Sequence, residues 1–178
     1  QRPQQLLSRF ARTRRVIFVE EPIFETSAGL APAGAEFRLN REPMGVPPST
    51  EVAGVVTAQP ICRDPGVGGG PVLDEMYALL LKQLVASENI GRYVLWFYTP
   101  MLLPALRDLS PEAIVYDAMD ELSLFRFAPP ELVSRERELL SRAQVVFAGG
   151  RSLGEAKSQL HPKVFTLPSG VEIDHFRK

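Results

Sequence analysis

The chain has 178 residues, of which 45% are hydrophobic and 23% charged, which excludes a disordered or fibrous protein and suits one globular domain. A formal net charge of −1 excludes a general attraction to nucleic acid or to an anionic membrane, so any basic surface is local. With a single cysteine, Cys62, the chain can form no internal disulfide and no cysteine-based zinc site, as expected of a cytoplasmic protein.

The first predicted element is a short helix over about residues 3–13. Pro3 suits the first turn of a helix, because the N–H group that proline lacks would have no partner there. The expected apolar face of this helix consists of Leu6, Leu7, Phe10 and Ala11. Residues 16–19 then form a β-branched and aromatic run, which predicts a strand buried on both faces of a parallel sheet. Because the sequence enters the helix without an initiator methionine, we expect that a preceding segment is missing.

The segment from about 22 to 71 differs from the rest, because it is rich in proline and glycine and has no helical period. Two candidate strands lie within it, at residues 36–39 and 52–57, and we predict that they form a small hairpin. A glycine-rich run at 66–70 ends the segment. A dinucleotide-binding fingerprint would need a glycine in place of Pro71, so the run is interpreted as a flexible linker.

Helices and strands alternate regularly in the remainder of the chain. A clear amphipathic helix is predicted after Asp74, with its apolar stripe formed by Tyr77, Leu80, Leu81, Leu84 and Val85. Strands are predicted at 93–98, 113–117, 145–148 and 164–167, and the helices between them start at Pro100, cover 130–143 and start at Ser152. Such alternation predicts βαβ units, and therefore an α/β fold with a parallel sheet flanked by helices.

Local side-chain pairs support two of these helices. The pairs Glu131–Arg135 and Glu138–Arg142 have the i,i+4 spacing that stabilises a helix over residues 130–143. Ser152 is followed three residues later by Glu155, which is the pattern of a capping box. The last helix is therefore predicted to begin at Ser152.

Ligands of open parallel sheets bind beyond the carboxyl ends of the strands, and this rule selects four polar clusters, at residues 98–100, 117–121, 149–152 and 168–170. The densest contains Asp117, Asp120 and Glu121, whose mutual repulsion makes one of them a candidate general base. Such a base could take a proton from a sugar hydroxyl. The alternative is that Asp117 caps the next turn and that the other two carboxylates are merely solvated.

The cluster at residues 149–152 is a candidate anion pocket. Gly149 and Gly150 let the backbone approach a ligand, and Arg151 precedes the N-terminus of a predicted helix, so a phosphate or carboxylate could bind there. The alternative is a tight turn into a capped helix. His161 and His175 are too far apart to indicate a metal site, so no metal is predicted.

Four stretches of the sequence together resemble a known family: WFYTP at 96–100, VYDAMDEL at 115–122, FAGGRSL at 147–153 and LPSGV at 167–171. In this order they are similar to the N-terminal half of bacterial glycosyltransferases of the GT-B fold, family-four-like and associated with UDP-galactopyranose mutase. The resemblance covers nearly the whole chain and is weakest from about 22 to 71.

The resemblance implies that residues 1–178 form a single Rossmann-like, acceptor-side domain with an insertion at about 22–71. It also implies that the C-terminal donor domain and the first strand of the sheet are missing. The implied reaction is attack by an acceptor hydroxyl on a nucleotide sugar, UDP-linked, with no other cofactor. The fragment alone is expected to be inactive.

Asp117 and Asp120 are the implied catalytic residues, which would orient or deprotonate the acceptor hydroxyl. The strand-end rule and the resemblance together give the substrate-binding candidates Arg2, Gln4, Tyr98, Glu121, Arg151, Ser152, Ser169 and Gly170. The implied partners are a nucleotide-sugar donor and a sugar or lipid-linked acceptor, but no nucleic acid.

Four arginines, at positions 9, 12, 14 and 15, give the first helix a local positive patch. This patch predicts a peripheral contact with the anionic inner face of the cell membrane, and the alternative is a solvated face that aids solubility. A rival function for the whole chain is a non-catalytic Rossmann-like module that binds a carbohydrate, nucleotide or protein. Fold alone does not separate the enzyme from this module.

Overall fold

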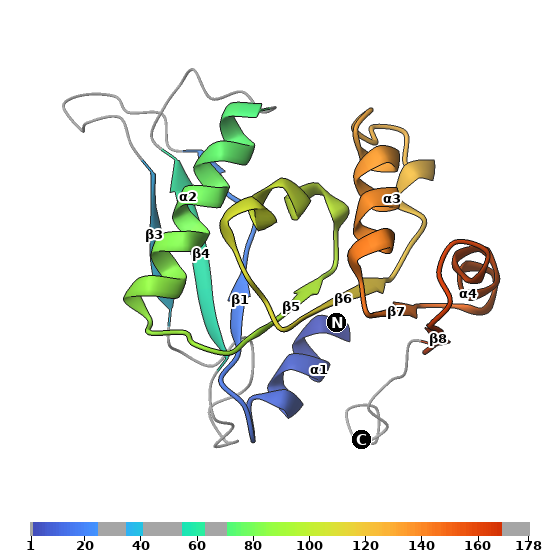
Figure 1. The fold of residues 1–178 in the computed structure, drawn as a ribbon, viewed down its shortest axis with the longest axis horizontal. Coiled ribbons are helices and arrows are strands. Elements are labelled where there is room, and N and C mark those ends of the chain that lie inside the picture. Colours follow the sequence, from blue (N-terminus) through green and yellow to red (C-terminus); the bar gives the residue numbers. More distant parts are fainter. Residues whose placement is uncertain (1, 25–34, 41–54, 63–70, 169–178) are drawn as a thin grey trace, which may run out of the picture. The chain divides into compact units, whose positions relative to one another are not determined.

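The computed structural model describes residues 2–24, 35–40, 55–62 and 71–168, and Figure 1 traces them as a coloured ribbon. Contacts within the chain divide it into two compact units, Gln1–Met76 and Tyr77–Lys178, and each unit is described by itself. The interpretation of residues 1–178 as a single domain stays a prediction.

The first unit contains a short helix and a mixed sheet of four strands. Its elements are α1 (Arg2–Phe10), β1 (Ile17–Val19), β2 (Ile23–Phe24), β3 (Ala35–Asn40) and β4 (Val56–Cys62). β4 is the central strand: β3 runs antiparallel along one of its edges, and β1 and β2 run parallel to it. Because β3 occupies one edge of β4, β1 and β2 share the other edge, one after the other.

The predicted hairpin is confirmed as the antiparallel pair of β3 and β4, although its second strand begins at Val56 and extends to Cys62. Residues 52–54 of that prediction and the glycine-rich run at 66–70 lie outside the described residues. The prediction of a fully buried strand at 16–19 is wrong, because all three residues of β1 are half-buried. β1 pairs with β4 and, among the described strands, with no other, which leaves it without neighbours on its second edge.

Helix α1 exposes more of its predicted apolar face than expected. Leu7 and Ala11 are 6% exposed, but Phe10 is 38% exposed. Only the arginine at position 9 lies in α1, and those at positions 12, 14 and 15 follow the helix, but all four are exposed, so this basic patch faces solvent.

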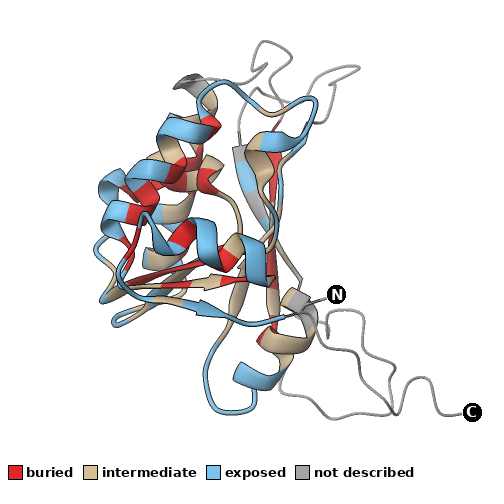
Figure 2. Cartoon of the chain, turned by 90° about the vertical axis from the view of Figure 1, so that its right-hand side faces the viewer, coloured by how far each residue is buried: buried red, intermediate tan, exposed pale blue. Residues whose placement is uncertain are grey.

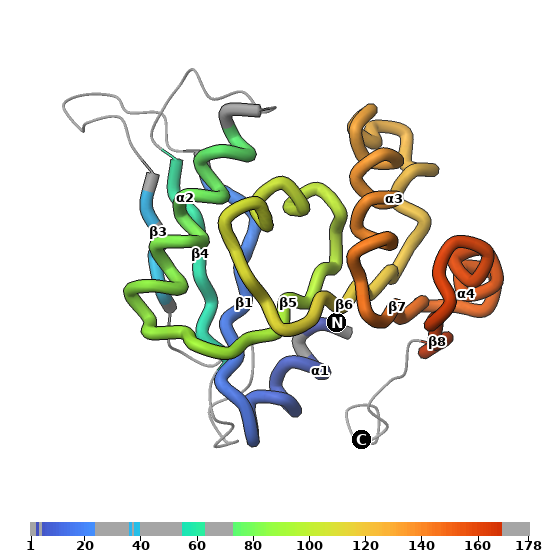
Figure 3. The backbone as a smooth tube through the Cα atoms, in the orientation of Figure 1, coloured from blue at the N-terminus to red at the C-terminus, as the bar shows by residue number. Residues whose placement is uncertain are grey.

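The second unit contains a Rossmann-like sheet of four parallel strands in the order β5-β6-β7-β8. Its strands are β5 (Val94–Phe97), β6 (Ala113–Ala118), β7 (Val145–Ala148) and β8 (Val164–Thr166). The 3-10 helix η1 (Pro100–Asp108) connects β5 to β6. The 3-10 helix η2 (Leu122–Leu124) and the α-helix α3 (Leu132–Arg142) connect β6 to β7, and the α-helix α4 (Arg151–Ser158) connects β7 to β8. The chain can be followed through these elements in Figure 3. The prediction of an α/β fold with a parallel sheet is confirmed. Helix α2 (Pro71–Ser87) spans the boundary between the units and begins three residues before Asp74.

One face of this sheet carries the hydrophobic core. Apolar side chains of the strands, such as Ile114 and Val146, pack with Leu103 of η1 and with Leu139 of α3, and Leu153 of α4 packs against the same cluster. These helical elements therefore cover a single face. Figure 2 shows the resulting pattern, with buried residues on the strands and on parts of the helices. The pattern follows from short apolar strands joined by helices with one apolar stripe each.

The opposite face of the sheet carries an aromatic row. The rings of Trp96 and Phe147 are stacked, with centroids 5.4 Å apart. The ring of Phe165 is tilted against that of Phe147, with centroids 6.1 Å apart. Asp117 pairs in register with Phe147, and side chains of paired residues in parallel strands point to the same face. Asp117 therefore lies on the aromatic face of the sheet.

Candidate functional site

The carboxyl ends of β5, β6 and β7 lie along one edge of the parallel sheet, as the strand-end rule requires of a ligand site. Two of the predicted clusters follow β5 and β7 directly, beginning at Tyr98 and Gly149, and a third, at 117–121, begins within the end of β6. The polar contacts at this edge are dominated by residues that the sequence analysis did not select.

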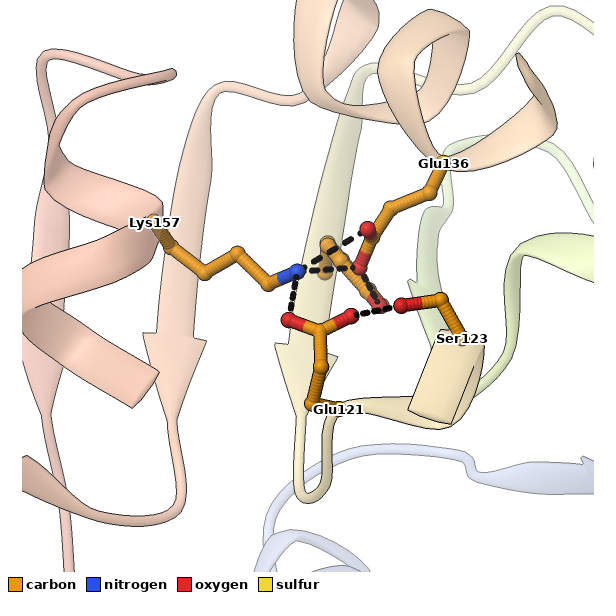
Figure 4. Close-up of polar contacts among 5 residues, drawn as sticks. Glu121, Ser123, Glu136 and Lys157 are labelled. Atoms are coloured by element: carbon orange, nitrogen blue, oxygen red, sulfur yellow. Dashed lines mark hydrogen bonds and ion pairs between the residues drawn. The ribbon is translucent and has the colours of Figure 1, made fainter. Parts of the chain in front are cut away.

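Lys157 is the centre of a buried ionic cluster, shown in Figure 4. Its ammonium group donates to Glu121 Oε2 at 2.8 Å and lies 2.8 Å from Glu136 Oε1. The side chain of Lys157 is 3% exposed, compared with 9% for Glu136 and 29% for Glu121. The lysine comes from α4, Glu136 from α3 and Glu121 from the loop after β6, so the cluster joins three parts of the unit.

Two hydroxyl groups complete the cluster. Tyr116 donates from its buried phenol to Glu136 Oε1 at 2.7 Å, and Ser123 Oγ donates to Glu121 Oε1 at 2.7 Å. We call Tyr116, Glu121, Ser123, Glu136 and Lys157 the lysine cluster. Each carboxylate accepts one hydrogen bond from the ammonium and one from a hydroxyl group, so neither buried carboxyl group lacks a hydrogen-bond donor.

The lysine cluster shifts the pKa values of its members in the directions that its contacts require. Burial alone would raise the pKa of Glu121, but the hydrogen bonds from Lys157 and Ser123 outweigh burial and lower it. Burial alone would lower the pKa of Lys157, but the bonds to Glu121 and Glu136 outweigh it and raise that pKa. Burial and the bond to Glu136 raise the pKa of Tyr116. Glu121 is therefore ionised, Lys157 charged and Tyr116 neutral near pH 7.

The two candidate catalytic carboxylates occupy different environments. Asp120 is exposed to solvent in the turn after β6. Asp117 is 0% exposed and is a residue of β6 itself. Asp117 therefore belongs to the strand and to the buried part of the unit, not to the turn that follows. Its burial follows from its register beside Phe147 on the aromatic face.

Glu121 is engaged by Lys157 and Ser123 and is thus less available to a substrate than the sequence analysis assumed. Tyr98 is half-buried, and its phenolic oxygen is buried. Arg2 and Gln4 lie in the first turn of α1, and the placement of their side chains is outside the described part of the structure, as are Ser169 and Gly170 entirely.

The glycine pair after β7 allows a close approach between two loops. A Cβ atom on Gly149 would lie 2.6 Å from the backbone oxygen of Met119, whereas one on Gly150 would meet nothing within 4 Å. α4 begins at Arg151 with Gly150 as its N-cap, so the predicted capping box at Ser152 is wrong. Ser152 is exposed inside the helix, and Arg151, with 92% of its side chain exposed, pairs with Glu155 at 3.1 Å.

An apolar hollow of about 440 Å³ opens beside the lysine cluster. Its lining comes from the turn after β5, the loop after β6 and the start of α3, and consists of Thr99, Leu122, Phe125, Arg126, Phe127, Ala128, Pro129 and Leu132. The hollow is shallow and largely open to solvent, and part of its wall, Phe125 and Phe127, is itself exposed. The hollow is at the carboxyl edge of the sheet, and Leu122 in its wall is two residues from Asp120.

The sequence pattern of two helices indicates the lysine cluster. The buried residues of α3 are Leu132, Glu136, Leu139 and Leu140, which places a carboxylate inside an apolar i, i+4, i+7, i+8 stripe. Lys157 stands four residues after Leu153, which is in the apolar stripe of α4. A charge of each sign in the apolar stripes of two helices on one sheet predicts a buried pair.

Among the described residues, no group of three or more histidine, cysteine or acidic side chains is arranged to hold a metal ion. Within the same residues, no helix is both long and apolar enough to cross a membrane. The fold by itself does not specify a function. No protein-family model, no curated protein and no solved structure matches this chain.

Proposed function

We propose that the chain is the acceptor-side half of a bacterial glycosyltransferase, whose donor half binds a nucleotide sugar, UDP-linked. The observation that supports this proposal is an exposed carboxylate, Asp120, next to a residue fixed by buried ionic contacts, at the carboxyl edge of a Rossmann-like sheet. The hollow beside it offers space for a substrate. The rival, a non-catalytic binding module, needs no such carboxylate.

In the proposed reaction a hydroxyl of the acceptor attacks the anomeric carbon of the nucleotide sugar. The new glycosidic C–O bond forms, the bond to the nucleoside diphosphate breaks, and the hydroxyl proton passes to Asp120. A general base must remain within hydrogen-bond reach of its substrate, so its backbone must be held in place. The bonds of Glu121 to Lys157 and Ser123 hold the residue directly after Asp120, which makes Glu121 a positioning residue. Asp117, buried behind the strand end, would orient this segment and not touch the hydroxyl.

The departing diphosphate needs positive charge as its bond breaks. Arg151 is exposed at the N-terminus of α4, where helix-end N–H groups also favour an anion. The acceptor would be a sugar or a lipid-linked sugar, and the enzyme would act in the cytoplasm. The exposed arginines of α1 and of the segment directly after it would then supply a peripheral, electrostatic contact with the inner face of an anionic membrane.

The test is sugar transfer by the intact enzyme with Asp120→Asn, which removes the proton acceptor and changes little else. A general base contributes about 10²- to 10⁴-fold, so turnover should fall by that factor while the melting temperature stays unchanged. Asp108→Asn is a matched control, because Asp108 is also exposed but precedes β6 and therefore lies toward the opposite edge of the sheet. Normal turnover of the Asp120 variant would rule out this residue as the base, whereas no sugar transfer by the unsubstituted intact protein would favour the binding module.

A further inference from the structure

The loop between η2 and α3 exposes large apolar side chains to solvent. Leu124 is 81% exposed, Phe125 58% and Phe127 87%. Single exposed apolar residues are ordinary, but three within four consecutive positions form a concentrated patch that marks an interaction surface. We call residues 124–127 the apolar loop.

The apolar loop is held firmly at both ends. On its N-terminal side, Glu121 and Ser123 belong to the lysine cluster. On its C-terminal side, Leu132 at the start of α3 is 4% exposed. The three side chains therefore project from a backbone that is anchored on both sides.

The backbone of the apolar loop satisfies several of its own polar groups. Leu124 N donates to Glu121 O at 3.0 Å, Phe125 N to Leu122 O at 3.3 Å, and Ala128 N to Phe125 O at 3.0 Å. Pro129 and Pro130 follow and have no N–H group. A segment whose donors are paired internally can enter an apolar medium at a smaller cost than an open loop.

Arg126 gives the apolar loop a cation among its apolar side chains. Its guanidinium carbon lies 5.4 Å from the centroid of the Phe127 ring, within the range of a cation–π contact. An arginine with an aromatic neighbour suits the boundary between lipid headgroups and acyl chains, because its stem is apolar and its charge reaches the phosphates. The charge therefore complements a phospholipid surface.

From these observations we propose that the apolar loop inserts into the headgroup–acyl boundary of a phospholipid membrane. A stable interface with a second protein needs about 20–30 residues on each side, and the loop offers four. A lipid surface makes no such demand, because it adapts its shape to whatever apolar side chains enter it. The inference does not rest on the proposed sugar transfer, and it differs from the contact assigned to α1, which would be purely electrostatic.

The experiment places a tryptophan at the tip of the loop in the intact protein, as Phe127→Trp. Its emission is recorded with vesicles of phosphatidylcholine, with and without phosphatidylglycerol, and the spectrum of the unsubstituted protein is subtracted to remove Trp96. Quenching by brominated phosphatidylcholine reports the depth of the ring. Leu160→Trp is the matched control, because Leu160 is 59% exposed but precedes β8, toward the opposite edge of the sheet.

The proposal requires a blue shift and shallow quenching for Phe127→Trp and neither for Leu160→Trp. Adding Leu124→Ser should weaken partitioning by roughly tenfold, since a buried leucine side chain is lost. Binding to phosphatidylcholine should persist at high salt, whereas a contact through the arginines at positions 9, 12, 14 and 15 would weaken. Arg126→Gln should reduce only the extra affinity for phosphatidylglycerol.

Three results would overturn the proposal. The first is no spectral change with either vesicle composition, and the second is an equal change for Leu160→Trp. The third is a blue shift that appears without vesicles and grows with protein concentration, with a doubled mass in sedimentation, because it would assign the loop to contact with a second copy of the chain.

Discussion

Lys157 has almost no contact with water, although lysine is among the residue types that are least often fully buried. Its burial is tolerated because two carboxylates and two hydroxyl groups form one connected set of bonds around it. The acidic cluster at residues 117–121 was predictable from the sequence, because adjacent polar residues follow an apolar run. Its contact with Lys157 was not, because Lys157 lies 36 residues later in α4 and no pattern near Glu121 indicates this partner.

We predict that Lys157→Met destabilises the fold by about 3 kcal/mol near neutral pH, because it leaves Glu121 and Glu136 facing each other without a cation. This is the lower end of the usual cost of breaking a buried pair, since Glu121 is partly exposed to water. Chemical denaturation monitored by circular dichroism measures the change. Lys163→Met is the control, because Lys163 is exposed and should alter stability little.

The pH dependence separates this explanation from a simple packing defect. The lowered pKa of Glu121 means that its contribution is complete above about pH 4.3, the value of an unfolded glutamate, and is lost as the pH falls through the folded value. The raised pKa of Lys157 means that its contribution to stability is complete below about pH 10.4, the value of an unfolded lysine. This contribution is lost as the pH rises through the folded value. In Lys157→Met, acid should instead relieve the repulsion between Glu121 and Glu136. The difference in the free energy of unfolding between this variant and the unsubstituted protein should therefore become smaller near pH 4. A difference in the free energy of unfolding that stays constant with pH would refute the electrostatic explanation.

At the scale of elements, the four strands of the parallel sheet were predictable to within about two residues. Each is a short apolar run between turn-forming residues, which is a strong local pattern. The errors concern features that local patterns do not determine. β2 has two residues, too few for a period, and the N-cap of α4 is Gly150, although the sequence offered Ser152. The pairing of β1 with β4 depends on contacts between residues far apart in the chain.

The junction between β6 and β7 gives a prediction at this scale, because Gly149 allows the two connecting loops to touch. Gly149→Ala should cost roughly 1–3 kcal/mol, since the new methyl group would meet the backbone oxygen of Met119 and the backbone would have to move. Gly150→Ala is the matched control, with open space around the added atom and an extended backbone that alanine adopts easily. Thermal melting of both variants provides the measurement, and equal melting temperatures would show that the loops separate without cost.

At the scale of the whole molecule, the Rossmann-like sheet determines where a ligand can bind but not what the ligand is. Alternating strands and helices made this part of the architecture predictable. The division into two compact units was not predictable from the same patterns, because the two sheets are built from similar short strands. The location of the candidate site follows from the sheet, whereas the reaction assigned to it depends on residues at one edge.

The proposed reaction predicts that residues 1–178 alone do not transfer sugar, even when they are folded. Asp120 would supply a base, but no second half would hold the nucleotide sugar in line with the acceptor or exclude water from the reacting atoms. Positioning of two reactants accounts for a large part of an enzymatic rate, so its loss should reduce turnover to background. The measurement compares sugar transfer by this chain with transfer by the intact enzyme at equal concentration. The donor half added as a separate protein should restore part of the rate, and Asp120→Asn in this chain should abolish that gain. Transfer by residues 1–178 alone at the rate of the intact enzyme would mean that both substrates bind to this chain. That result would refute the proposal that acceptor and donor bind to separate halves of the enzyme.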